Sequence, residues 1–105
     1  MPQFDVYRNP DRETQARMPY VVTLQSSLLS DLDHHVVAPL RIAEDDSVVP
    51  MLRLNPIVLI DGQRFHLRIQ DIAAVPRRLL KTPVANLSSQ REEILAAIDF
   101  LFTGF

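Results

Sequence analysis

Residues 57–69 read IVLIDGQRFHLRI, which is the clearest local structural signal in the chain. A short apolar run leads into Asp61-Gly62, after which apolar residues at every second position, beginning with Phe65, alternate with arginine and histidine. Asp-Gly supplies the positive φ angles that a two-residue type I′ turn requires. Strict alternation gives a strand one core face and one face towards solvent or a partner. The stretch therefore predicts a β-hairpin.

Three segments before the hairpin also have strand character. Residues 3–7 alternate, so we expect a half-buried strand with Phe4 and Val6 inward. Residues 19–25 are rich in β-branched and aromatic side chains and predict a second strand. Residues 35–40 predict a third, in which Pro39 favours an edge position or a strand end. An exposed loop is expected at 8–17 and an acidic turn at 43–47. After the hairpin, residues 71–75 are ambiguous and 77–81 are expected to form a short strand.

The end of the chain changes to a helical period. Ser89 and Glu92 have the spacing of a capping box, in which each side chain bonds a backbone N–H of the first turn. Apolar residues then recur at helical spacing from Ile94 almost to residue 105. Either all the aromatic rings of this helix fold into the core, or part of its end forms an interface. Phe100 is expected to point away from the apolar stripe, which favours an interface.

Composition limits the class of protein. The 105 residues suit one domain, residues 1–105, and 47% hydrophobic with 23% charged residues is ordinary globular composition. The absence of cysteine excludes disulfides and cysteine-based metal sites, and only two glycines exclude a glycine-rich phosphate loop. A net charge of −2 provides no general attraction to nucleic acid. Without a signal peptide or an apolar run that could cross a membrane, we expect a cytoplasmic protein.

Few residues suggest catalysis or metal binding. His34 and His35 are adjacent on a predicted strand, so they point to opposite faces and cannot hold one metal ion together. No motif that pairs a general acid with a general base is evident, so we do not expect an enzyme.

Six segments in order resemble one known family. They are residues 3–7 (QFDVY, similar to its first strand), 22–29 (VTLQSSLL, similar to V-D-V-Q-S-x-aliphatic-aliphatic), 36–40 (VVAPL, similar to V-I-P-L), 56–60 (PIVLI, similar to P-V-V-H-I), 71–76 (DIAAVP, similar to D-M-A-S-V-P) and 86–104 (similar to its final helix and tail). Together they span nearly the whole chain. On these segments the chain resembles the CcdB family of toxins from bacterial toxin–antitoxin modules.

This resemblance implies a mainly β fold with a C-terminal α-helix, an SH3-like barrel of antiparallel strands, without metal or cofactor. It implies a homodimer that binds the A subunit of DNA gyrase and traps the enzyme on cleaved DNA. A cognate antitoxin with a disordered C-terminal segment would neutralise the toxin and co-repress the operon, so operator DNA would be contacted only through the antitoxin.

The resemblance also implies two sets of contact residues. Those for gyrase are Ser26, Leu28, Leu29, Asp99, Leu101, Thr103, Gly104 and Phe105. Those for the antitoxin are Arg8, Arg12, Arg17, Glu44, Asp45 and Asp46. Thr103 stands where the best-known toxin has a tryptophan that stacks on an arginine of gyrase, and losing that cation–π contact removes about 1–2 kcal/mol. Two alternatives stay open. One is a degenerate homologue that dimerises and binds antitoxin without poisoning gyrase. The other is a ribonuclease toxin of the same fold, for which the set open to such chemistry is His35 with Asp33 and Arg41.

Overall fold

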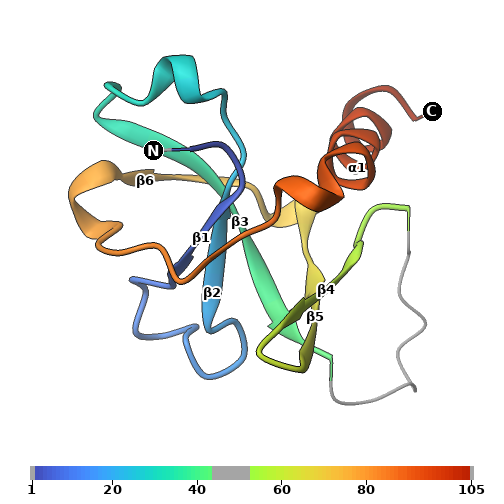
Figure 1. Cartoon of the computed structure of the whole chain (residues 1–105), viewed down its shortest axis with the longest axis horizontal. Coiled ribbons are helices and arrows are strands. Elements are labelled where there is room, and N and C mark those ends of the chain that lie inside the picture. The colour runs from blue at the N-terminus through green and yellow to red at the C-terminus, as the bar shows by residue number, and fades with distance from the viewer. Residues whose placement is uncertain (1, 44–52, 105) are drawn as a thin grey trace.

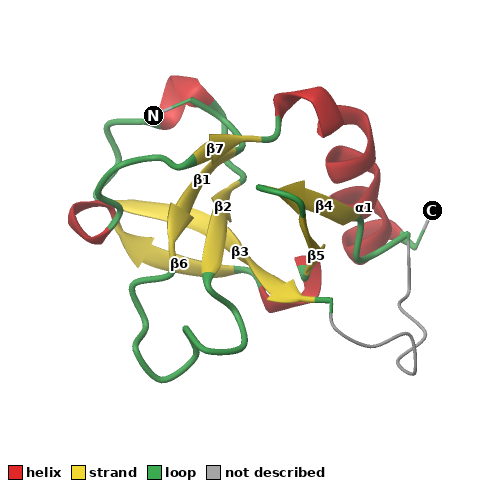
Figure 2. Ribbon diagram, turned by 60° about the horizontal axis from the view of Figure 1, so that its bottom comes forward, coloured by secondary structure: helices red, strands yellow, loops and turns green. Residues whose placement is uncertain are grey.

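The computed structural model describes residues 2–43 and 53–104 (Figure 1). In chain order the strands and the helix are β1 (Asp5–Arg8), β2 (Tyr20–Thr23), β3 (His34–Ile42), β4 (Ile57–Ile60), β5 (Gln63–Leu67), β6 (Ala73–Pro76), β7 (Ala85–Asn86) and α1 (Arg91–Thr103). Short 3-10 turns lie between them: η1 (Ser27–Leu29), η2 (Ile69–Asp71), η3 (Arg77–Leu79) and η4 (Ser88–Gln90). All the pairings within the described ranges are antiparallel, in the order β4-β5-β3-β2-β1-β7, with β6 also on β3. The sheet curls into a nearly closed barrel, as expected for an SH3-like fold (Figure 2).

The predicted hairpin is confirmed as β4 and β5. Ile60 pairs with Gln63, and the two residues between them have φ angles of 51° at Asp61 and 81° at Gly62. Two positive φ angles define the type I′ turn, whose twist matches that of the flanking strands. Phe65 is buried, whereas Arg64 before it is exposed, as the alternation requires.

The strand with Pro39 is central, so the expected edge position is wrong. β3 pairs with β2 on one side and with both β5 and β6 on the other. Pro39 lies between the segment paired with β6, which ends at Val37, and the segment paired with β5, which begins at Leu40. The N–H that proline lacks would point into this gap. The carbonyl oxygen of Pro39 still accepts a hydrogen bond from the N–H of Arg68 at 2.9 Å.

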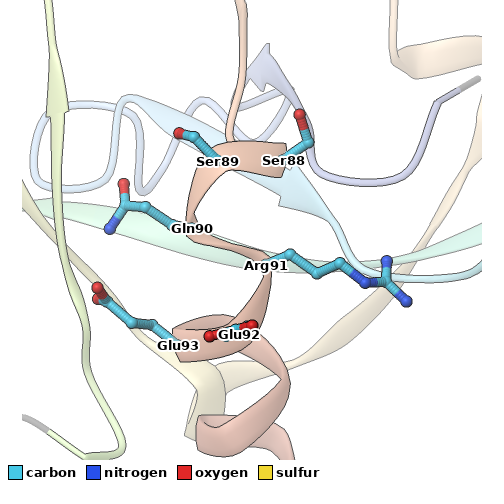
Figure 3. Close-up of a pocket in the computed structure, with 6 residues that line it drawn as sticks. All are labelled: Ser88, Ser89, Gln90, Arg91, Glu92 and Glu93. Carbon is cyan, nitrogen blue, oxygen red and sulfur yellow. The ribbon is translucent and has the colours of Figure 1, made fainter.

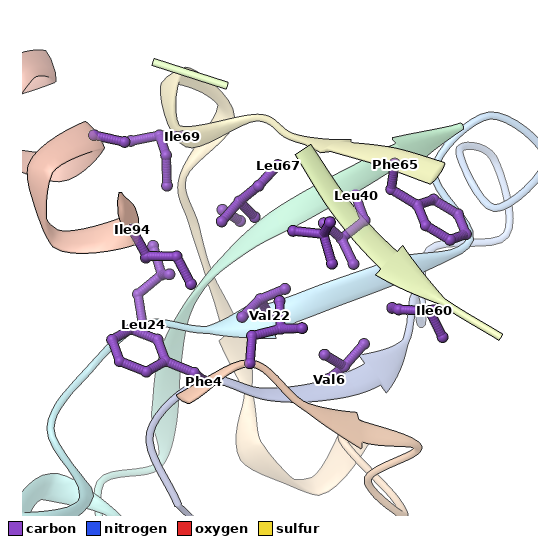
Figure 4. Packing of buried hydrophobic residues seen from close by; sticks show 14 residues of the cluster. Phe4, Val6, Val22, Leu24, Leu40, Ile60, Phe65, Leu67, Ile69 and Ile94 are labelled. Carbon is purple, nitrogen blue, oxygen red and sulfur yellow. The ribbon is translucent and has the colours of Figure 1, made fainter. Parts of the chain in front are cut away.

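Two apolar clusters lie on the two faces of the sheet. The larger fills the barrel and takes in Ile94 and Ala97 of α1 (Figure 4). The smaller contains Tyr7 with Val21, Val37 and Leu80. β1 is therefore buried on both faces, and the expectation of a half-buried strand is wrong. Burial raises the pKa of the Tyr7 phenol above its ordinary value, and the nearby Asp5 carboxylate raises it further.

Two local expectations at the C-terminal end also fail. The Ser89–Glu92 capping box does not form, because Ser88–Gln90 make a 3-10 turn and α1 begins only at Arg91. The Gln90 side chain instead donates to the carbonyl oxygen of Ile57 at 2.9 Å. The strand expected at 77–81 is a 3-10 turn, and the strand lies earlier, at Ala73–Pro76. β3 begins at His34, so the ladder with β6 has no partner residues beyond that point.

Candidate functional site

The end of α1 presents half of the predicted gyrase-contact residues. Asp99, Leu101, Thr103 and Gly104 are all exposed. Gly104 follows the helix in the left-handed conformation, with φ 76° and ψ 16°, and its N–H donates to the carbonyl oxygen of Phe100 at 3.0 Å. A glycine there turns the chain out of the helix without steric cost. Phe105 lies outside the described residues.

Among the described residues at this end, the exposed aromatic side chain is Phe102, which is not in the predicted contact set. Phe102 is 72% exposed, whereas Phe100 is half-buried. The guanidinium of Arg53 lies over the Phe100 ring, 4.4 Å from its centroid. The helix end does expose an aromatic ring, as the sequence pattern predicts, but the ring is that of Phe102 and not that of Phe100. Both rings lie roughly 100° from the buried stripe on a helical wheel, so helical spacing could not separate them.

Ser26, Leu28 and Leu29 form a second exposed group, at the turn η1. Leu28 is 94% exposed and Leu29 is 48% exposed. The Ser26 hydroxyl accepts a hydrogen bond from the N–H of Leu28 at 3.2 Å, and so caps the turn. Gln25 fastens the turn to β3, since its amide donates to the Leu29 carbonyl and accepts from the N–H of Val36, each at 3.0 Å. The turn holds two leucines towards solvent.

The structure does not bring these two groups together within one chain. The turn η1 and the end of α1 lie on opposite sides of the molecule along its longest axis, as Figures 1 and 2 both show. A partner that contacts both groups must therefore span one chain or meet two copies of it.

The predicted antitoxin residues Arg8, Arg12 and Arg17 lie at or in an ordered loop. All three are exposed, and none of them has an ion pair with another residue in the ranges 2–43 and 53–104. Asn9, which sequence reasoning missed, holds the loop: its side chain donates to the Thr14 hydroxyl at 2.9 Å and to the Met18 carbonyl at 2.8 Å. The signal was the Asn-Pro-Asp sequence, because asparagine side chains commonly bond backbone two residues on. Glu44, Asp45 and Asp46 lie outside the described residues.

The residues open to ribonuclease chemistry are not assembled into a site. His35 is 1% exposed, and its Nε2 lies 3.1 Å from the carbonyl oxygen of Ser30. Arg41 is six positions further along β3, roughly 20 Å away at the rise of a strand. His34 and His35 do point to opposite faces, since His34 is exposed. Among the residues that the structure describes, no three histidine, aspartate or glutamate side chains are grouped to hold a metal ion.

A shallow depression of about 500 Å³ lies where α1 begins (Figure 3). Ser88, Ser89 and Gln90 line it together with Arg91, Glu92 and Glu93. None of these belongs to either predicted contact set. The two glutamates disfavour an anion at this helix N-terminus, so the depression suggests no ligand.

Comparison with known proteins agrees with the arrangement described above. The family model described as CcdB protein matches residues 3–104. The match includes the loop held by Asn9, the turn η1 and the end of α1 up to Gly104. In the described ranges, no helix is both long and apolar enough to cross a membrane. The chain belongs to the CcdB family, the gyrase-poison family of toxins from toxin–antitoxin modules.

Proposed function

We propose that the chain is a toxin that binds the A subunit of DNA gyrase and traps the enzyme on cleaved DNA. It acts by binding and is not itself an enzyme. The observation that carries the proposal is the exposed end of α1, where Leu101 and Phe102 follow the last buried helix residue, Ala97, and Gly104 ends the helix in the left-handed conformation. An apolar helix end that is exposed to solvent is typical of an interface with another protein.

The energies favour binding despite the missing tryptophan. Losing a cation–π contact at Thr103 costs about 1–2 kcal/mol. Phe102 is 72% exposed, and burying a phenylalanine side chain against a partner contributes about 1.5–3 kcal/mol. The Phe102 ring is therefore large enough to offset the loss.

A homodimer belongs to the same proposal. The separation of η1 from the end of α1 supports it, because two copies would present both groups, twice, to a symmetric target. Sedimentation at micromolar concentration should give about twice the chain mass of 12.0 kDa. A clean monomer at that concentration would count against the dimer.

We also propose that an antitoxin neutralises the toxin by binding the exposed arginines of the loop. Arg8, Arg12 and Arg17 suit the acidic, disordered segment that the family's antitoxins would supply, through charge-assisted hydrogen bonds. This surface does not share residues with the end of α1. Antitoxin binding and gyrase binding are therefore expected to be separable.

One observation favours the degenerate homologue as a second candidate. The Thr103 hydroxyl donates to the carbonyl oxygen of Asp99 at 2.6 Å, so it is bonded back to the helix rather than turned to a partner. Such a protein would still dimerise and bind antitoxin.

Induced expression in gyrase-sensitive cells separates the candidates. Matched cells carry a resistance mutation in the gyrase A subunit. Toxicity that the mutation relieves supports gyrase poisoning. Toxicity that persists points to another target such as RNA, and absence of toxicity in expressing cells supports the degenerate homologue.

A further inference from the structure

The outer face of the sheet formed by β3, β5 and β4 is cationic. Arg41 pairs with His66 across β3 and β5, and Arg64 lies two residues before His66 on the same strand. Alternate residues of a strand share a face, so these three side chains project from the face opposite the barrel core. Arg41 and Arg64 are exposed, and His66 is half-buried.

Among the residues that the structure describes, neither Arg41 nor Arg64 has an acidic partner. The described residues contain one ion pair, Arg68 with Asp71 at 2.5 Å, and it involves neither Arg41 nor Arg64. The Nδ1 atom of His66 is buried and has no hydrogen-bond partner within residues 2–43 and 53–104. The chain as a whole carries a net charge of −2, so the face differs in sign from the molecule.

Apolar side chains lie between the cationic ones. Leu59 of β4 pairs with Arg64 and is 63% exposed, and Ile57 pairs with His66 and is half-buried. Leu59 therefore places a large apolar side chain beside the exposed Arg64. Arginines alternating with leucine and isoleucine suit a partner that carries both carboxylates and apolar side chains.

The chemistry of the face disfavours two other occupants, a second copy of the chain and nucleic acid. A second copy docked here through a two-fold axis would bring like charges of Arg41 and Arg64 together. Nucleic acid is disfavoured because the face offers no aromatic side chain for stacking and the net charge is negative.

We propose that this face, defined by Arg41, Leu59, Arg64 and His66, docks an acidic stretch of the antitoxin's disordered segment. The inference rests on the proposed function for the identity of the partner. The face adjoins the arginine loop: the N–H of Ile42 donates to the carbonyl oxygen of Arg17 at 3.2 Å. A segment held by the loop can continue onto the face, with carboxylates on the arginines and apolar side chains on Leu59.

The test uses the purified full chain and a fluorescein-labelled peptide of alternating glutamate and leucine, followed by anisotropy. Arg41→Glu/Arg64→Glu should weaken peptide binding at least about tenfold, since two charge-assisted contacts become repulsive. The matched control is Arg78→Glu/Lys81→Glu, which makes the same charge change on exposed residues near η3. The control should bind within about twofold of the wild type if the face, rather than net charge, holds the peptide.

Further variants test the apolar contact and check that the charge variants are folded. Leu59→Ser should also weaken binding, whereas Leu79→Ser, at a leucine that is 40% exposed on η3, should not. Misfolding of Arg41→Glu/Arg64→Glu would be excluded by a thermal melt that matches the wild type. It would also be excluded by an intermediate affinity of the neutral variant Arg41→Gln/Arg64→Gln. Equal losses in both charge variants, or stronger binding of duplex DNA than of the peptide, would overturn the proposal.

A gyrase cleavage assay on the same variants separates this inference from the proposed function. Arg41→Glu/Arg64→Glu should poison gyrase as the wild type does. A wild type that fails to poison gyrase would refute the proposed function, and the peptide titration would still report on the face.

Discussion

Replacing Gly104 with valine should weaken gyrase poisoning while leaving the barrel folded. Gly104 has φ 76°, and a Cβ built on it would meet no atom within 4 Å. The cost of a side chain is therefore conformational: the left-handed region costs a residue other than glycine about 1–2 kcal/mol. If gyrase binds the helix end with Gly104 in its left-handed conformation, this cost appears as a roughly five- to thirtyfold loss of affinity.

The assay is the toxin concentration that gives half-maximal DNA cleavage by purified gyrase, measured beside a thermal melt. Gly104→Asn should retain most of the activity, because asparagine tolerates the left-handed conformation. Gly62→Val is the matched control, since Gly62 has φ 81° and also has no atom within 4 Å of a built Cβ. That variant should lose about 1–2 kcal/mol of stability at the hairpin turn, with poisoning by the folded protein unchanged.

Two outcomes would contradict a role of Gly104 in gyrase binding. If Gly104→Val poisons gyrase at the wild-type concentration, gyrase does not use the geometry of the helix end. Alternatively, Gly104→Val could lower the melting temperature as much as Gly62→Val does. Gly104 would then be a structural residue rather than a director of the tail.

Three further predictions concern stability and the second partner. Burial and Asp5 raise the pKa of the Tyr7 phenol above 10.0, so the unfolded chain loses the phenol proton at a lower pH than the folded chain does. Stability should therefore fall as pH rises above about 10. Tyr7→Phe should reduce this fall in urea unfolding measured at several alkaline pH values. Ile94→Ala removes a fully buried side chain and should lower the free energy of unfolding by about 2–5 kcal/mol in denaturant titrations. Charge reversal of Arg8, Arg12 and Arg17 should weaken antitoxin binding in titration calorimetry and leave gyrase cleavage unchanged; equal losses in both assays would mean that the surfaces overlap.

The parts of the fold that could be predicted depend on local chemistry. Asp61-Gly62 and the alternation around Phe65 specify their hairpin from neighbouring residues alone, and the structure has it in the expected register. The left-handed turn at Gly104 was predictable for the same reason, because it needs only a glycine after a helix.

The predictions that failed concern features that depend on residues far apart in the sequence. Pro39 is tolerated inside β3 because two different strands meet at that point, which no local pattern of residues 35–40 could reveal. Tyr7 is buried because a second cluster covers the outer face of β1. The Phe100 ring is covered by Arg53, and this contact leaves Phe102 as the exposed ring at the candidate site.

The capping box failed for a related reason. Gln90 bonds the carbonyl oxygen of Ile57 in a strand far away in the sequence, and a 3-10 turn replaces the expected first turn of the helix. Ser89 and Glu92 have the right spacing, but that spacing is a helix signal only where the tertiary structure lets the helix begin there.

Gyrase poisoning is measured by incubating the purified wild-type chain with gyrase and supercoiled plasmid and quantifying cleaved DNA after denaturation of the enzyme. Cleaved DNA should accumulate as the toxin concentration rises. The accumulation should disappear when the A subunit carries the resistance mutation. Absence of cleaved DNA with folded toxin and active gyrase, or equal cleavage with the resistant enzyme, would contradict the claim that this chain poisons gyrase through its A subunit.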